Sequence, residues 1–289
     1  MKFFIGVLQV LLAGIGFGFL GVFGRLGYQN GLTTGELLSF RFSLAAILLW
    51  SGLILFRPKL VTLHPKQILI SLCLGFLGYA VFSTLYFESM KGISIPLAAM
   101  LLFTFPIFVN LGAHFILKET LSRLQVTSLI TASIGLVVLL WGDISVQSYN
   151  SVFLALGAAL TYSIYVLVSG KAQQNVEPLS SSLYVITAAA IGLWFYHRPA
   201  PAKLLELNAH QALIILGIAT ASTIAPLTLF LAGLQKMKSS QASIIVMIEP
   251  VVATFAASYF LHEDLSQRQL VGAGIILVAL VLDALGKKA

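Results

Sequence analysis

The sequence predicts an all-α integral membrane protein whose ten transmembrane helices form two inverted five-helix repeats. Three observations support this prediction. Hydrophobic residues make up 58% of the 289 residues and charged residues only 9%, against about 45–50% and about 25% in soluble domains. The apolar residues are concentrated in long runs, and the second half of the chain repeats the first. A soluble core of this length cannot bury so much apolar surface, so the lipid bilayer is the expected solvent.

Ten apolar segments of about 17–25 residues each are long enough to span a bilayer. Short polar stretches such as RPKLVTLHPK and QQNVEP separate them, which leaves little length for a soluble domain. The first segment has the outline of a signal peptide, but it lacks a small-x-small cleavage site, so we expect it to remain as a helix. The expected helices are 3–26, 36–56, 67–88, 94–117, 122–142, 150–171, 179–196, 210–233, 240–261 and 266–285.

The two halves of the chain match at a constant offset of 144 residues. Pro106 and Pro250 correspond at this offset, and AAILLW in the first half superposes on AAIGLW in the second without a gap. A period of this length exceeds the roughly 20–50 residues of solenoid units and indicates two copies of one unit. Further matched pairs are Glu119 with Glu263, Leu121-Ser122 with Leu265-Ser266, Gln125 with Gln269, and Ala113 with Ala257.

We expect the first repeat at 1–146 and the second at 147–289. Each contains five helices, an odd number, so the second repeat must start on the opposite face of the membrane from the first. Inverted halves can exchange conformations, so that a central cavity opens to one side of the membrane and then to the other. This architecture is typical of transporters that work by alternating access.

The charges in the loops predict that both chain termini are cytoplasmic. With the N-terminus inside, eleven Lys and Arg residues fall on the inner side, Lys287 and Lys288 among them, and four fall on the outer side. Arg25 and Arg41 are left out of this count as intramembrane or interfacial. Positively charged residues concentrate in cytoplasmic loops, so the excess places both ends of the chain inside.

Several function classes lack their chemical signatures in this sequence. The net charge is +7, but Lys and Arg are dispersed with no basic stripe, which argues against nucleic acid as a partner. Cys73 is the only cysteine, so an internal disulfide or a cysteine-ligated metal is excluded. No nucleotide-binding, HExxH, nucleophile-elbow or paired-carboxylate motif occurs. We therefore predict no catalytic residues, no metal and no cofactor.

Glu249 is the sharpest candidate for a substrate or coupling site. It lies about ten residues into the ninth expected helix, about 15 Å deep and near the bilayer midplane. A carboxylate at that depth is costly unless it is protonated, paired or facing water. It therefore indicates either a proton-coupling or amine-binding site, or a carboxyl hydrogen-bonded to neighbouring helices. Its counterpart in the first repeat is Phe105, so the two halves do not share its role.

Charged residues near the outer ends of the first two helices have structural interpretations as well. Arg41 lies about a turn inside the second helix and is either a site residue or a snorkelling or structurally paired arginine. Arg25 and Glu36 lie at the outer ends of adjacent helices, and we expect them to pair with each other.

Polar and aromatic side chains share three helix faces that suit a pocket for organic solutes. The same side chains equally suit interhelical hydrogen bonds, packing and interfacial belts, and both interpretations stay open. The candidates are Tyr79, Ser83 and Tyr86 on the third helix, Asn110 and His114 on the fourth, and Tyr162 and Tyr165 on the sixth.

Prolines and glycines mark the expected kinks and close contacts. A proline inside a helix removes one backbone hydrogen bond and permits a kink, and glycines on one face permit close approach of a second helix, within the chain or in a homodimer. The expected kink residues are Pro106, Pro226 and Pro250, and the expected contact residues are Gly14, Gly18 and Gly21.

Two stretches of the sequence resemble the paired halves of a known family. LYFESMKGISIPLAAMLLFTFPIFVNLGAHFILKETLS and FLAGLQKMKSSQASIIVMIEPVVATFAASYFLHEDLS are similar to the two repeats of the drug/metabolite transporter superfamily, in its ten-helix EamA-type branch. The residues that carry the resemblance are Ala98, Pro106 and Glu119 in the first stretch, Ala242, Glu249, Pro250 and Glu263 in the second, and Arg41 in the second helix.

The resemblance implies a secondary transporter in a bacterial cytoplasmic (inner) membrane. Helices 3, 4, 8 and 9 would line a central cavity, helices 1 and 6 would be mobile walls, and helices 5 and 10 would be peripheral. Many bacterial members of this family export amino acids and other small metabolites, so our leading hypothesis is export of such a small-molecule solute, either linked to protons or by a facilitator. Pro226 departs from the aromatic residue usual in the family. Uptake of a larger metabolite or cofactor, and a non-transporting membrane scaffold, stay as alternatives.

Overall fold

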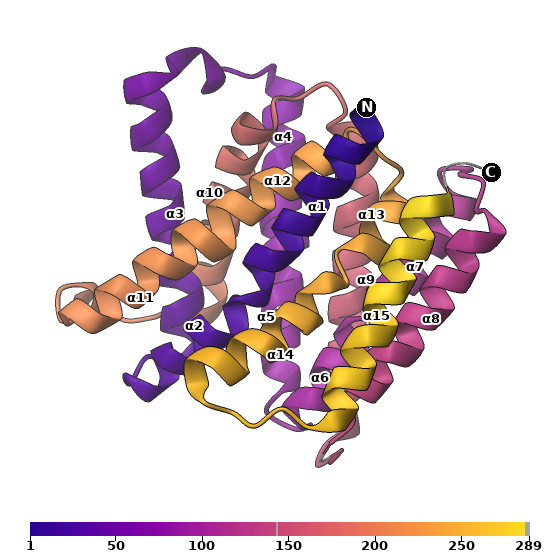
Figure 1. Cartoon of the computed structure of the whole chain (residues 1–289). Helices are drawn as coiled ribbons and strands as arrows, with labels where there is room; N and C mark the ends of the chain where they lie inside the picture. Colours follow the sequence, from indigo (N-terminus) through magenta and orange to yellow (C-terminus); the bar gives the residue numbers. More distant parts are fainter. Residues whose placement is uncertain (143, 287–289) are drawn as a thin grey trace.

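The computed structural model describes residues 1–142 and 144–286. These residues form helices and connecting turns, with one isolated β-bridge between Ile93 and Val146 and no strand among them. Ten helical spans are long and apolar enough to cross a membrane, which confirms the ten predicted helices (Figure 1). Lys287 and Lys288, which contribute to the predicted orientation, lie outside the described residues.

Each repeat consists of five spans, several of which are interrupted. The spans of the first repeat are α1 (Lys2–Gly18) with α2 (Leu20–Gln29), α3 (Thr34–Phe56), α4 (Pro65–Cys73) with α5 (Val81–Ser89), α6 (Ile95–Leu102) with α7 (Phe105–Phe115), and α8 (Arg123–Leu140). Those of the second are α9 (Tyr149–Ala172), α10 (Pro178–His197), α11 (Ala209–Ala219) with α12 (Ala225–Leu234), α13 (Ser239–Ile245) with α14 (Ile248–Leu261), and α15 (Gln267–Leu285).

The interruptions recur at corresponding places in the two repeats. A π-helical segment, Leu74–Ala80, joins α4 to α5, and another, Thr220–Ile224, joins α11 to α12. The fourth and ninth spans are broken between α6 and α7 and between α13 and α14. The three prolines expected to kink helices each lie in the first turn of a restarted helix, α7, α12 or α14, where a missing N–H removes no helical bond.

The last span of each repeat begins with the same capping box. At the start of α8, Ser122 Oγ accepts from the Gln125 backbone N–H and the Gln125 side chain accepts from the Ser122 N–H. Ser266 and Gln269 repeat this arrangement at the start of α15. Such reciprocal bonds satisfy two backbone donors that a helix start leaves free. The matched sequence pairs are therefore matched local structures.

The two repeats cross the membrane in opposite directions. Phe3 and Gly286, near the two chain ends, border one surface cavity, and we call this side of the protein the terminal face, at the top of Figure 1. The second repeat starts on the opposite side, because the Ser148 backbone N–H, just before α9, bonds to Gly92 O in the α5–α6 connection at 3.0 Å. We call this opposite side the mouth face.

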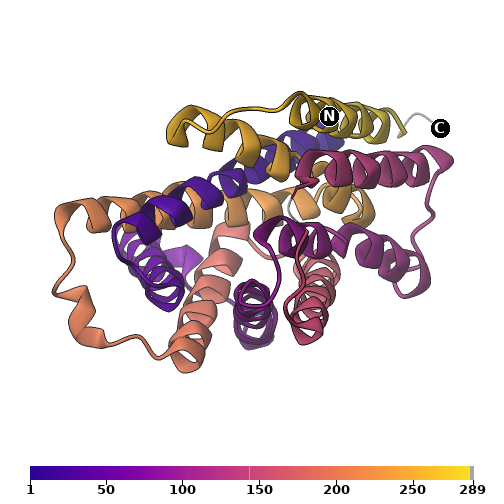
Figure 2. The same cartoon turned by 90° about the horizontal axis from the view of Figure 1, so that it is seen from below.

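The repeats interlock through their first spans. The helix α1 packs against α12 and α14 of the second repeat, and α9 packs against α5 and α7 of the first. The final spans, α8 and α15, lie side by side at one edge of the molecule (Figures 1 and 2). The fifth and tenth helices are therefore peripheral, as the resemblance implies.

Two of the three predicted contact glycines bring α1 close to α14. A Cβ at Gly18 would lie 2.7 Å from the Val252 Cβ and 2.9 Å from the Glu249 backbone oxygen, and one at Gly14 would meet the Ile248 side chain. Gly21 differs, because a Cβ there would have no neighbour within 4 Å. Gly21 makes no close helix contact within the chain and borders the central cavity.

We expect Gly18→Ala to lower the melting temperature of the detergent-solubilised protein. The added methyl group would meet backbone as well as side-chain atoms of α14, and such overpacking costs about 1–3 kcal/mol. Gly21→Ala is the matched control, since it adds the same group on the same span without a clash. Equal melting temperatures for the two variants would show that the α1–α14 contact is not tight.

Candidate functional site

A central cavity of about 680 Å³ opens on the mouth face between the two repeats. The first four spans and the ninth supply most of its lining, and the eighth contributes only Ile218. Helices 3, 4 and 9 therefore line the cavity as expected, whereas helix 8 contributes a single residue. Its Pro226 is buried against α1 near Gly16 and does not line the cavity.

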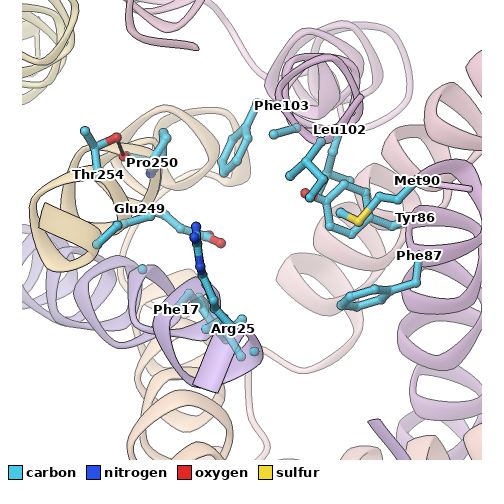
Figure 3. A pocket seen from close by; sticks show the side chains of 18 of the residues that line it. Phe17, Arg25, Tyr86, Phe87, Met90, Leu102, Phe103, Glu249, Pro250 and Thr254 are labelled. Carbon is cyan, nitrogen blue, oxygen red and sulfur yellow. Dashed lines mark hydrogen bonds between the residues drawn. The ribbon is translucent and has the colours of Figure 1, made fainter. Parts of the chain in front are cut away.

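Glu249 lies on the wall of this cavity. The break between α13 and α14 places it in the first turn of α14, half-buried. Figure 3 shows Glu249, Pro250 and Thr254 on one side of the cavity and Tyr86, Phe87 and Met90 on the other. Within the described residues no hydrogen bond or ion pair occupies the Glu249 carboxylate, so this group is open to the cavity and its contents.

Arg41 lies on the same cavity, on α3. Its side chain is buried, with 5% of the residue exposed, and its Nε atom has no hydrogen-bond partner. The Arg41 Cζ atom lies 4.7 Å from the centre of the Phe42 ring, and no acidic group pairs with it in the described part of the chain. Arg41 therefore has no ion pair within the described residues, and its described contact is with the Phe42 ring.

These two side chains give the cavity opposite charges without protein counter-ions. A charge inside the membrane is stable only when it is paired, neutralised or in contact with water. The described ion pairs are Arg25 with Glu263, Glu88 with Lys91, and Lys203 with Glu206. Neither Arg41 nor Glu249 belongs to these pairs, so both charges are available to the contents of the cavity.

Aromatic rings form a continuous wall beside these charges. The Tyr162 ring lies 4.7 Å from both Phe82 and Phe105, and Tyr79 lies 4.8 Å from Phe82. Tyr165 stacks on Tyr162 from behind with ring centres 5.9 Å apart and does not line the cavity. Packed rings of this kind provide an apolar surface, which suits the hydrocarbon part of an organic solute.

The predicted site residues separate into two groups in the structure. Asn110 and His114 lie away from the central cavity: Asn110 is buried and bonds to Ser243 on α13, and His114 is exposed with its Nδ1 atom 3.2 Å from Glu119 O. Asn110 therefore has the interhelical role left open above. The predicted residues that do line the cavity are Glu249, Arg41, Tyr79, Ser83, Tyr86 and Tyr162.

The mouth of the cavity holds an ion pair between Arg25 on α2 and Glu263 after α14. Glu36 has a different role, because its carboxylate accepts from Thr33 in the capping box of α3. The expected pairing of Arg25 with Glu36 is therefore wrong. Local capping satisfies Glu36, and the loop between α14 and α15 supplies the partner of Arg25 from the other repeat.

The sequence interpretation missed several cavity residues, among them Phe82, Phe103 and Phe105. The place of Phe82 in the cavity could have been predicted from the sequence, because Phe82 shares a helical face with Tyr79 and Tyr86. The place of Phe105 could also have been predicted, because Phe105 is the repeat counterpart of Glu249. No comparable signal marked Arg25 and Glu263 as partners, since they are far apart in the chain.

The amino-acid sequence matches a known protein family over both repeats. Residues 4–141 and 150–283 each match the model of the EamA-like transporter family. The chain belongs to the EamA-like transporter family. A family of this kind implies a small-molecule solute and a bilayer as partners, and the protein is a multi-pass membrane protein by its ten spans.

Individual relatives of this EamA-like protein are distant. The protein named uncharacterized transporter YcbK from Bacillus subtilis (strain 168) is 24% identical over 284 residues, with 93% of this chain and 89% of the relative covered. The threonine/homoserine exporter RhtA from Escherichia coli (strain K12) is 28% identical over 202 residues, with 68% and 64% covered. A crystal structure of a protein with 15% sequence identity superposes with a TM-score of 0.82 over 98% of both chains, which shows the shared fold.

We expect Arg41→Met to keep or raise the melting temperature of this EamA-like protein in the absence of solute. A buried charge without a counter-ion costs folding free energy, so replacing it by an apolar side chain of similar length removes that cost. Arg25→Met is the control, because an exposed ion pair contributes about 0–1 kcal/mol. A large drop in the melting temperature of Arg41→Met alone would mean that Arg41 has a structural partner.

Proposed function

We propose that the protein is a secondary transporter that exports small metabolites such as amino acids by alternating access. The family match and the printed names of YcbK and RhtA support transport. The name of RhtA, a threonine/homoserine exporter, favours amino acids and the outward direction. In this proposal Arg41 binds the carboxylate of the solute, and Glu249 binds its ammonium group or carries a proton.

The unpaired charges of one cavity are the observation that carries the proposal. Arg41 and Glu249 both line it, and neither forms an ion pair in the described part of the chain. A binding site that leaves two opposite charges open selects for a ligand with both charges, because burying either charge alone is costly. Amino acids are the commonest small metabolites of this class.

Glu249 also supports the proposal that transport is linked to protons. A carboxylate that faces a cavity near the membrane midplane can take up a proton from one side and release it to the other when the cavity changes sides. Competition between the proton and the ammonium group of the solute for the same carboxylate would couple their movements. Glu249 would then bind either the proton or the ammonium group of the solute, and never both at once.

The remaining parts of the proposal concern the boundary between the repeats, the membrane in which the protein lies and its orientation there. We place the boundary between the repeats at 146/147, which the two separate family matches support. We place the protein in the cytoplasmic membrane of a bacterium with both ends inside. The excess of positive loop charges supports this orientation, and the position of both described chain ends on the terminal face is consistent with it.

The proposal is tested by flux through the purified protein in liposomes. We expect exchange of radiolabelled amino acid across the membrane, and we expect Glu249→Gln to reduce that exchange at least tenfold and to abolish its response to a pH gradient. Glu88→Gln is the control, because Glu88 pairs with Lys91 at the surface and does not line the cavity.

Two outcomes would contradict the proposal in different ways. Wild-type flux and an unchanged pH response in Glu249→Gln would remove Glu249 from the mechanism. An absence of flux for every amino acid in the wild-type protein would favour the alternatives, a carrier for a larger metabolite or cofactor or a non-transporting scaffold. Flux assays in inside-out and right-side-out vesicles distinguish export from uptake.

A further inference from the structure

A second cavity, of about 670 Å³, lies on the terminal face. Four of its lining residues have repeat counterparts, at the offset of 144 residues, that line the mouth of the central cavity. The pairs are Glu119 with Glu263, Thr120 with Asp264, Leu121 with Leu265, and Gln125 with Gln269. The second cavity therefore has the same place in the first repeat that the mouth has in the second.

The helices next to this second cavity are closed against each other. The helices α7 and α13 pack together. The Asn110 side chain on α7 donates to Pro106 O of its own helix at 2.8 Å, as its counterpart Thr254 does to Pro250 O, and it also donates to Ser243 Oγ at 3.3 Å and to Ser240 O at 3.4 Å on α13. Ser240 Oγ donates to the Glu119 carboxylate at 2.6 Å. Glu119, Asn110, Ser240 and Ser243, which we call the polar lock, join the two repeats, and no more than 3% of any of the last three is exposed.

The repeat counterparts of the polar lock are parted on the mouth face. Thr254 is the counterpart of Asn110 and Ala99 that of Ser243, and both line the open central cavity. The Thr254 hydroxyl donates to Pro250 O of its own helix at 2.9 Å and makes no bond to α6 (Figure 3). The same pair of positions is therefore in contact on one face and separated on the other.

The geometry points to the second cavity as the closed inner mouth of the same transport path, with the polar lock as its gate. This inference rests on the proposed function and deepens it. When the two repeats exchange conformations, Asn110 separates from Ser240 and Ser243, and the second cavity joins the central one. The counterpart helices α6 and α14 then close the mouth face.

The gate differs in strength between the two faces. The counterparts of Ser240 and Ser243 are Pro96 and Ala99, which have no side-chain hydroxyl to donate or accept. Closure of the mouth face would therefore lack the hydrogen bonds that close the terminal face. The polar lock biases the protein without solute toward the state with an open mouth.

Cysteine accessibility tests this gate directly. The single native cysteine is removed by Cys73→Ser, and one reporter is introduced at a time, Ala113→Cys or Ala257→Cys. Ala113 is fully buried, whereas its counterpart Ala257 lines the open cavity. Each protein, in vesicles of known orientation, is treated with a membrane-impermeant maleimide, and the labelling rate is measured from each face.

We expect Asn110→Ala to raise the labelling of the Ala113→Cys reporter from the terminal face about fivefold or more, the population change that loss of a buried hydrogen bond produces. The same variant should lower the labelling of the Ala257→Cys reporter from the mouth face. Ser243→Ala should act in the same direction and decides the matter if Asn110→Ala does not fold. Thr254→Val is the matched control and should change neither rate.

Unchanged labelling at Ala113 in both lock variants would overturn the gate. A rise at both reporters together would also overturn it, because this would indicate local loosening and no exchange between two states. The labelling needs no solute, so it is independent of the flux assay. A wild-type protein without flux would contradict the transport proposal and leave the gate standing, whereas flux with unchanged labelling would contradict the gate alone.

Discussion

The cost of placing charge inside a membrane is the constraint on which the rest of this structure depends. Arg41 and Glu249 lie on transmembrane helices, and each lacks a partner of opposite charge among the described residues. Such groups persist in a membrane protein where they are neutralised or where water or a ligand reaches them, and both of these groups border the central cavity. The fold therefore has to keep a cavity between its halves, and the cavity exists because two inverted repeats meet without filling the space between them.

The interrupted helices of the two repeats supply residues of the candidate binding site. The breaks in the fourth and ninth spans put Phe105 and Glu249 at equivalent positions of the two repeats, both lining one cavity. One repeat thus supplies an aromatic ring and the other a carboxylate, so a symmetric frame holds an asymmetric site. The same asymmetry continues in the polar lock, where Ser243 has the hydroxyl that Ala99 lacks. The symmetry of the two repeats allows the protein to alternate between two states. The residues that differ between the repeats determine what the site binds and which of the two states is favoured.

The sequence predicted the fold well because the signals for it are local or periodic. Apolar run length marks the ten spans, and the constant offset marks the repeats down to the capping boxes of Ser122 and Ser266. Non-local contacts were the weak point. Arg25 meets Glu263 across 238 positions of sequence, and nothing in the local pattern of Gly21 separates it from Gly18. Helical faces can be assigned from spacing, but what each face meets depends on packing between distant segments.

The most direct test of the central claim is the melting temperature of the detergent-solubilised protein with matched small solutes. A ligand that binds only the folded state stabilises it by about 2.7 kcal/mol at a concentration of 100 Kd. We predict that an apolar amino acid raises the melting temperature, that its amine and carboxylate analogues raise it far less, and that Arg41→Met abolishes the difference. Equal shifts for all three solutes, or the same shifts in Arg41→Met, would contradict a cavity built around two unpaired charges.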